Sequence, residues 1–218
     1  MTVMRTITLL FAATAVFAAE TVTTPIDNDQ VKVLSVLVQP HEKTRLHQHK
    51  VNRVMIYLMA GTQDINYQDT GKTVLQFKAG EAKWSPAGGM HIAEITSPNA
   101  VGIIEVELKK PGSGKIAGAS PLDPVKIDPK HYKVDFENDQ VRVLRVRFGP
   151  HEMAPLHEHS LNRVVVYLAD QNFRITSADG TVEMQHHKRG EVSWGGPTKH
   201  KEENLNDKPM EVAVVELK

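Results

Sequence analysis

The sequence contains one short pattern twice, HQHKVNR at 47–53 and HEHSLNR at 157–163. Both copies hold two histidines one residue apart, followed at a fixed distance by Asn-Arg. Residues i and i+2 of a β-strand point to the same face, so each His-x-His pair projects to one side. Two imidazoles at this spacing can hold one metal ion, and the pattern therefore indicates strands that carry paired ligands.

The repetition extends far beyond these seven residues. Three further segments of the first half return in the second: NDQVKVLSVLVQPHE (28–42) as NDQVRVLRVRFGPHE (138–152), KAGEAKW (78–84) as KRGEVSW (188–194), and EVELK (105–109) as VVELK (214–218). Each copy is longer than a solenoid repeat and has the size of a small domain. We expect two related domains at 20–110 and 131–218, joined by a linker at 111–130 that is rich in Gly, Pro and Ser.

Within each copy the apolar segments are short, β-branched and bounded by turn residues, as in VKVLSVLV at 31–38 and NRVVVYL at 162–168. No window after the first 20 residues sustains the i, i+3, i+4, i+7 spacing of an amphipathic helix. The sequence therefore predicts an all-β protein made of two small barrels or sandwiches in tandem.

The first 19 residues differ from the rest of the chain. Arg5 precedes an apolar run from 7 to 17, and Ala18 and Ala19 supply small residues for cleavage. We interpret 1–19 as a secretory signal, because the run is short for a membrane span. The prediction is a periplasmic or secreted protein with no membrane attachment after cleavage, and an uncleaved anchor is the alternative.

Composition narrows the range of partners. Lys+Arg and Asp+Glu both number 26, so the formal net charge is zero, and the chain has no cysteine. Neither a basic patch nor a nucleic-acid-binding motif is present, so we expect no nucleic-acid partner. The expected partner is a small molecule, and the expected state is a monomer or a homodimer.

Histidine is the unusual residue, with 11 copies. A third histidine follows a Gly-Pro loop in each half, which gives two candidate sets of metal ligands: His47, His49 and His91, then His157, His159 and His200. Imidazoles suit a divalent transition metal such as Fe, Zn, Mn, Ni or Cu. The alternative is that these histidines are polar core contacts. The remaining histidines without a repeat partner are expected at the surface: His131, His186 and His187.

Taken together, these motifs resemble those of the bicupins, in which two cupin barrels follow one another. The first cupin motif reads G-x5-H-x-H-x3,4-E-x6-G and the second G-x5-P-x-G-x2-H-x3-N. Beyond the six histidines, the second motif is matched by Gly80, Pro86 and Gly88 in one copy and by Gly190 and Asn204 in the other. The resemblance implies two tandem jelly-roll barrels, each a double-stranded β-helix with a metal in its mouth.

The resemblance has one informative departure. Arg53 and Arg163 stand three residues after the second histidine, where the family has a glutamate, and arginine cannot ligate a metal. We therefore expect three-His sites that lack a coordinating acid. Glu42 and Glu152 precede the motifs, and we expect them at the barrel rim rather than at the metal.

A dipositive ion held by neutral imidazoles keeps its charge, and an inward arginine adds another. This predicts a cavity that favours an anionic ligand, with Arg53 and Arg163 anchoring the anion, because arginine binds carboxylates bidentately. The alternative is that both arginines face outward and form weak surface pairs.

Three functions remain open at this point. The first is a metal-dependent, dioxygenase-like oxidoreductase acting on a small anionic substrate. The second is a non-catalytic bicupin that binds or senses a small ligand and holds structural metal. The third is a metal-free scaffold, since a fold does not fix a function.

Overall fold

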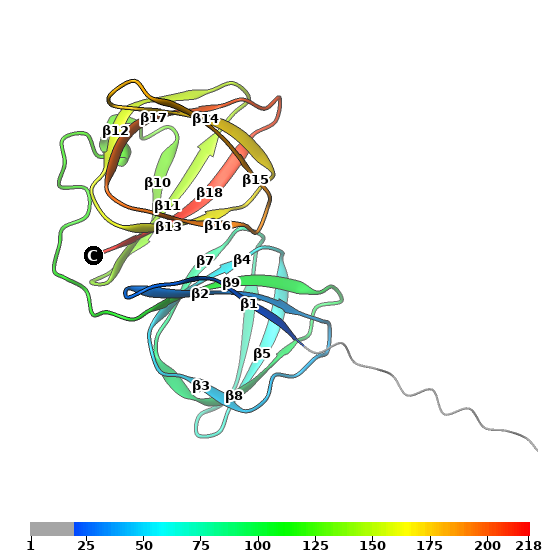
Figure 1. The fold of residues 1–218 in the computed structure, drawn as a ribbon. Coiled ribbons are helices and arrows are strands. Elements are labelled where there is room, and N and C mark those ends of the chain that lie inside the picture. Colours follow the sequence, from blue (N-terminus) through cyan, green and yellow to red (C-terminus); the bar gives the residue numbers. More distant parts are fainter. Residues whose placement is uncertain (1–19) are drawn as a thin grey trace, which may run out of the picture.

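The computed structural model describes residues 20–218, so the export signal expected over 1–19 lies outside the described residues. Within 20–218 the regular secondary structure is almost entirely strand, as predicted, and the strands form four antiparallel sheets (Figure 1). Strands β1 to β9 make up barrel 1 and strands β10 to β18 make up barrel 2.

Each barrel is built from a five-stranded and a four-stranded sheet. In barrel 1 the larger sheet has the order β1 (Thr21–Asp27), β2 (Val31–Val38), β9 (Val101–Leu108), β4 (Arg53–Tyr57), β7 (Ala82–Ser85). Its smaller sheet has the order β3 (His47–His49), β8 (Gly88–Ile95), β5 (Gly61–Tyr67), β6 (Gly71–Phe77). The crossovers between the sheets are those of a jelly roll.

Barrel 2 repeats this topology strand for strand. Its larger sheet has the order β10 (Tyr132–Glu137), β11 (Val141–Phe148), β18 (Met210–Leu217), β13 (Arg163–Tyr167), β16 (Val192–Gly195). Its smaller sheet has the order β12 (Met153–His159), β17 (Thr198–Asn204), β14 (Gln171–Ser177), β15 (Val182–His187). The predicted tandem of two jelly-roll barrels is confirmed.

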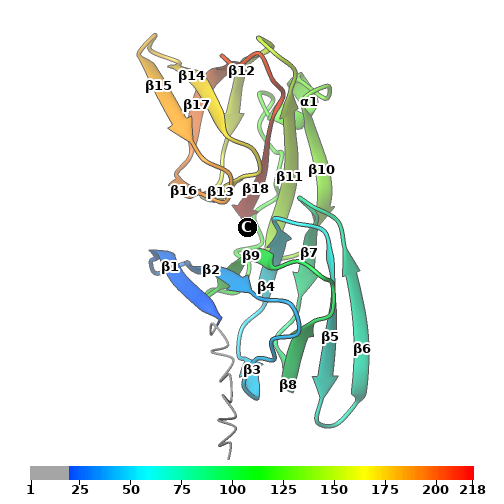
Figure 2. The ribbon, with the colours of Figure 1, turned by 90° about the vertical axis from the view of Figure 1, so that its right-hand side faces the viewer.

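The two five-stranded sheets pack against each other, and their facing side chains form a core that belongs to both barrels (Figures 1 and 2). In β4, Val54 and Ile56 join this shared core, whereas Met55 and Tyr57 point into barrel 1. Both faces of the central strands are therefore buried. Each fully buried aliphatic side chain contributes roughly 1.5–3 kcal/mol, so the shared core holds the barrels together.

Polar contacts at the rim of the shared core are reciprocal. Asn52 donates a hydrogen bond to Gln140 across the interface, and Asn162 donates one to Gln30 at 3.1 Å. Asn52 and Asn162 are equivalent in the repeat, as are Gln30 and Gln140, so the same contact is made in both directions, as in an isologous dimer. The asparagine of each repeated HxHxxNR pattern therefore serves the contact between the barrels.

The segment between β9 and β10 contains the short helix α1 (Pro124–Ile127), whose N-cap Asp123 accepts a hydrogen bond from Val125 N at 3.1 Å. A proline at the first helical position fits, because its missing N–H has no partner there in any case. The expected boundaries at 110 and 131 stay a prediction. Within residues 20–218, no helix combines the length and the apolar character required to span a membrane.

Candidate metal centres

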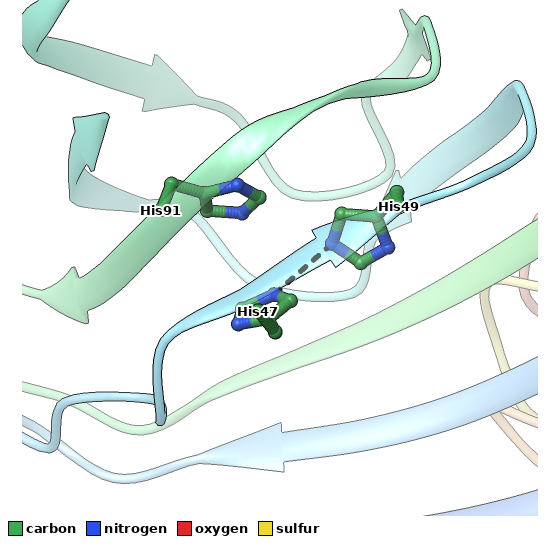
Figure 3. Close-up of side chains that lie close together, drawn as sticks. All are labelled: His47, His49 and His91. Atoms are coloured by element: carbon green, nitrogen blue, oxygen red, sulfur yellow. Dashed lines mark hydrogen bonds between the residues drawn. The ribbon is translucent and has the colours of Figure 1, made fainter. Parts of the chain in front are cut away.

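The three histidines of barrel 1 converge. His47 and His49 lie on β3, and His91 lies on the neighbouring β8, directly opposite His47 in the sheet register. Each ring offers one nitrogen, and these nitrogens lie within 4.8 Å of one another. Figure 3 shows the three rings gathered between the two strands, with His47 Nε2 3.1 Å from His49 Nε2. This spacing is that of ligands around a single ion.

Barrel 2 brings together the corresponding histidines. His157 and His159 lie on β12, and His200 lies opposite His157 on β17. Their ligand nitrogens also lie within 4.8 Å of one another. All three are buried, with His157 fully so, whereas His47 and His49 in barrel 1 are half-exposed. The two predicted three-His groups are thus both present, in different surroundings.

Backbone carbonyls fix the orientation of several of these rings. His47 Nδ1 donates to the Arg45 carbonyl at 2.8 Å, His91 Nδ1 to the Gly89 carbonyl at 2.9 Å, and His157 Nδ1 to the Pro155 carbonyl at 2.9 Å. A proton on Nδ1 leaves the lone pair of Nε2 free, which is the tautomer that binds a metal through Nε2.

The groups favour neutral imidazoles. Burial, followed by the charge of Arg53, lowers the pKa of His49 to about 3. Burial lowers the pKa of His200 to about 2, and it also lowers the pKa values of His91 and His159. Neutral imidazoles are the form that ligates a metal, so no proton has to be displaced at neutral pH.

A buried nitrogen without a hydrogen-bond partner indicates that the three barrel 2 histidines fit a metal ion. His200 Nε2 is buried and forms no hydrogen bond. Buried polar atoms normally have a partner, and leaving one unpaired costs about 1–3 kcal/mol. A cation at the centre of the group would satisfy this nitrogen, so the residues fit a divalent transition metal.

Arg53 points into barrel 1. Its Nη1 lies 2.8 Å from Glu105 Oε2 and 2.5 Å from each ring nitrogen of His49, and its Nε donates to Ser85 Oγ at 3.2 Å. Burial raises the pKa of Glu105, and Arg53 opposes that rise. The guanidinium therefore already has a carboxylate partner, and it places a positive charge against one of the candidate ligands.

Arg163 also points inward, but its partners differ. Its Nη1 donates to the Gly196 carbonyl at 2.5 Å, and it forms no ion pair within residues 20–218. The Arg163 side chain lies over Gly195, where a Cβ would come to 2.9 Å from Arg163 Cζ, so it occupies the space that a side chain would take where barrel 1 has Ser85. Both arginines therefore face inward, and only Arg163 is without a carboxylate partner.

The expectation of a pocket without acid needs correction in barrel 2. Glu216 on β18 accepts a hydrogen bond from His159 Nδ1 at 2.9 Å, and Glu202 Oε2 on β17 lies 3.8 Å from His200 Nε2. Neither glutamate occupies the position at which the cupin motif has its own. Glu216 reaches the site from β18, which follows the second motif, whereas Glu202 stands at one of the unspecified positions between His200 and Asn204 within that motif.

Glu216 belongs to a buried chain of charges. Its other oxygen lies 2.6 Å from Arg142 Nε, and Arg142 Nη2 lies 2.7 Å from Asp123, the N-cap of α1. The chain runs from the segment between the barrels to His159, and it fixes that ring in the manner of a carboxylate that orients a metal ligand. The matching positions in barrel 1, Lys32 and Glu107, form no such pair within residues 20–218.

A cavity of about 350 Å³ opens beside the barrel 2 histidines. Its wall includes His159, Arg163, His200, Glu202 and Gln171. The Gln171 side chain is 3% exposed, and both its nitrogen and its oxygen lack a hydrogen-bond partner. The equivalent position in barrel 1 is Gly61, so this unpaired amide exists in barrel 2 alone of the two described barrels.

The turns before the motifs behave as expected for the rim. His41 and His151 adopt φ values of 61° and 56°, in the left-handed region where the cupin motif has glycine. Glu42 accepts a hydrogen bond from Gln39 N at 3.2 Å, and Glu152 accepts one from Gly149 N at 2.6 Å. Both glutamates close their turns, and Glu42 also lines a cavity together with His47 and His49.

The prediction for His131 is wrong. This side chain is buried, lies between Asp128 Oδ2 at 2.6 Å and Glu152 Oε2 at 3.0 Å, and stacks on Phe148 with ring centroids 4.3 Å apart. His187 is half-buried against Tyr167, with centroids 3.7 Å apart, so surface placement fails there too. Asp128 and Glu152 lie three and 21 residues from His131 in the sequence, and no sequence pattern indicated that they would contact it.

Known proteins resemble this chain in structure but not in sequence. No protein-family model and no curated protein matches the sequence. Among solved structures, AerE from Microcystis aeruginosa superposes with a TM-score of 0.69 at 11% identity, covering 94% of this chain and 95% of that one. A cupin 2 conserved barrel domain protein from Leptotrichia buccalis gives 0.57 at 13% identity, covering 94% and 92%.

Oxalate decarboxylase from Bacillus subtilis, in a structure that concerns its Mn(II) centres, gives a TM-score of 0.61 at 14% identity. The match covers 86% of this chain and 69% of the decarboxylase. Identities this low establish the architecture and leave the chemistry of each protein its own. The chain therefore has the bicupin fold, with two cupin barrels in tandem and a three-histidine group in each.

Proposed function

We propose that this protein is a metal-binding bicupin whose second barrel binds a small organic anion beside a divalent transition metal. His157, His159 and His200 would hold the ion in barrel 2, and His47, His49 and His91 would hold one in barrel 1. The observation that carries the proposal is the unpaired polar groups of barrel 2: His200 Nε2 beside the cavity and the amide of Gln171 in its wall.

The cavity residues supply the chemistry of binding. Arg163 has no carboxylate partner and lines the cavity, so it can pair with a ligand anion. Gln171 has an unpaired donor and an unpaired acceptor, which match a hydroxyl, amide or carboxylic acid group elsewhere on the ligand. The volume of about 350 Å³ admits a small molecule. Arg53 already binds Glu105, so we expect anion binding first at Arg163.

The finer proposal is an oxidoreductase of the dioxygenase-like kind. A bound transition metal would act there as a Lewis acid and as a template for the substrate. The burial of the histidines keeps bulk water from the centre, and Arg163 orients the substrate charge. The candidate metals are iron, zinc, manganese, nickel and copper, and manganese gains support because a structural neighbour is described by its Mn(II) centres.

Metal analysis of the purified protein comes first, and we expect about two equivalents of a divalent transition metal at saturation. Oxygen consumption with Fe(II) and a panel of small carboxylates, enediols and thiols then tests catalysis. Oxygen uptake that requires one panel compound, and that is lost in Arg163→Gln, would support the oxidoreductase. Tight binding of a compound without turnover would instead support a non-catalytic binding protein. A metal-free preparation that binds no added ion would contradict the proposal.

We further propose that the protein is exported, on the basis of the leader pattern over 1–19. The N-terminus of protein recovered from the cell envelope or the medium should lie near residue 20. An intact N-terminus in cytoplasmic material alone would contradict export.

A further inference from the structure

Glu202 lies beside the barrel 2 histidines but is not one of the three candidate ligands. It lies two residues after His200 on β17, and residues at that spacing share a face, so its carboxylate points into barrel 2 with the histidine. Its Oε2 lies 3.8 Å from His200 Nε2, and its side chain is 13% exposed. Ligand atoms about 2.1 Å from a common tetrahedral ion lie about 3.4 Å apart, so the observed separation is close to that of neighbouring ligands.

Tyr132 fixes the other oxygen of this carboxylate. The Tyr132 hydroxyl donates to Glu202 Oε1 at 2.7 Å, and it also lies 3.2 Å from His157 Nε2. Tyr132 is almost completely buried, so the contact is shielded from water. One oxygen is therefore held in place while Oε2 faces the unpaired His200 Nε2, which is the arrangement of a ligand oriented by a hydrogen bond.

Barrel 1 lacks both parts of this arrangement. The residue that matches Glu202 in the repeat is Ala93, and the residue that matches Tyr132 is Val22. Arg53 lies against His49 in barrel 1, whereas Arg163 of barrel 2 donates to the Gly196 carbonyl. The barrel 2 group therefore has a carboxylate on the strand of its third histidine, and the barrel 1 group has an alanine at that position.

We propose that Glu202, positioned by Tyr132, is the fourth protein ligand of the barrel 2 metal, while barrel 1 holds its ion with histidines only. The inference rests on the proposed function, because it requires the three histidines to bind an ion. Only the histidine nitrogens lie mutually within 4.8 Å, so Glu202 stands at the edge of the group and reaches the ion from the His200 side. The carboxylate lowers the charge of the centre from +2 to +1, and barrel 2 is the tighter site.

The test isolates each barrel in the full chain. A parent with His47→Ala and His49→Ala keeps only the barrel 2 group, and a second parent with His157→Ala and His159→Ala keeps only the barrel 1 group. Co(II) is the probe, because both its affinity, measured against a chelator, and its visible absorption depend on the ligand set. Circular dichroism of the metal-free variants controls for folding.

In the parent with only barrel 2, Glu202→Gln should weaken Co(II) binding by tenfold or more and change the visible spectrum. Tyr132→Phe, which removes the hydrogen bond and leaves the carboxylate, should weaken binding by a smaller factor and serves as a second variant if Glu202→Gln does not fold. The parent with only barrel 1 should bind Co(II) more weakly than the parent with only barrel 2.

The outcomes separate the two proposals. Unchanged affinity and an unchanged spectrum in both Glu202→Gln and Tyr132→Phe would overturn the fourth ligand and leave the three-histidine site standing, with Glu202 serving only to pair Tyr132. Absence of Co(II) binding in the folded barrel 2 parent itself would overturn the metal site, and the fourth ligand with it.

Discussion

The two barrels have the same strand order and the same three histidines, yet they surround these histidines differently. In barrel 1, His47 and His49 are half-exposed, and a guanidinium already paired with Glu105 lies beside them. In barrel 2 the group is buried, acids flank it, and a cavity with unpaired polar atoms adjoins it. The same three histidines are present in both copies, and the side chains around them differ between the barrels.

Burial makes the differences in charge around the two histidine groups energetically important. Charges interact more strongly in the low dielectric of an interior than at a surface, and an uncompensated buried charge is strongly destabilising. The buried charges of Glu216, Arg142 and Asp123 compensate one another as a chain, whereas the buried Arg163 has no carboxylate partner within residues 20–218. Variants at equivalent positions of the two barrels should therefore differ in their effects.

The largest effect is expected at Glu216. Glu216→Ala removes the partner of the buried Arg142 and should lower the free energy of unfolding by about 3–5 kcal/mol, measured by urea denaturation. Its repeat partner Glu107 forms no ion pair within residues 20–218, so Glu107→Ala should change the free energy by less than about 1 kcal/mol. Equal losses in the two variants would remove the distinction between the barrels.

The next effect concerns metal content. His157→Ala and His47→Ala should each remove about one equivalent of bound metal at saturation, measured by elemental analysis. Because His157 is fully buried and contacts Tyr132, its replacement should also lower the melting temperature of the metal-free protein more than His47→Ala does. Full stoichiometry in both variants would defeat the assignment of the ligands.

Anion binding should distinguish the two arginines. Arg163→Gln should weaken binding of the tightest carboxylate in the panel by about 10–100-fold, since hydrogen bonds to charged groups contribute about 1.5–3 kcal/mol. Arg53→Gln should change it less than about threefold, because Arg53 already binds Glu105. Calorimetric titration of the metal-loaded protein measures both, and the reverse order would move the ligand site to barrel 1.

Replacing Gln171 should have two smaller effects of opposite sign, one on stability and one on ligand binding. Gln171→Leu replaces a buried amide whose two polar atoms lack partners, so it should stabilise the unliganded protein by about 1 kcal/mol. The same change should weaken ligand binding, because the ligand loses the partner that the amide would supply. Loss of stability together with unchanged ligand binding would show that the amide is satisfied in another way.

The smallest effect depends on pH. Hydrogen bonds from Lys130, then from Gly149 N and His131, lower the pKa of Glu152 to about 2, below its ordinary 4.5. The unfolded chain takes up the proton first, so the stability supplied by this carboxylate is complete above pH 4.5 and is lost as the pH falls from 4.5 through 2. The melting temperatures of the protein and of Glu152→Gln should therefore differ at pH 6, differ less at pH 3 and converge below pH 2, whereas a constant difference would exclude the ionised carboxylate as the cause.

Much of the architecture could be predicted without coordinates. The repeat of whole segments, the short β-branched runs and the His-x-His spacing predicted two all-β barrels and the six histidines that converge in pairs of strands. These features are local, because strand periodicity alone places residues i and i+2 on one face. The inward direction of Arg53 and Arg163 was one of two alternatives, and periodicity could not decide it because each arginine begins a new strand in the other sheet.

The partners of these residues depended on contacts between distant segments. The shared core buries both faces of the central strands, so alternation could not tell which side chains face the neighbouring barrel and which face the cavity. Asn52 and Asn162, repeated beside the arginines, gained their role only when the two barrels met.

Sequence by itself thus determined the fold class and the six candidate histidines, since the strand pattern, the His-x-His spacing and the repeat can all be read along the chain. Tertiary structure alone decided that Glu216 and Gln171 lie near the barrel 2 histidines and that Glu105 pairs with Arg53 in barrel 1. Glu216 is 57 residues from His159, so only the folded sheets bring the two together.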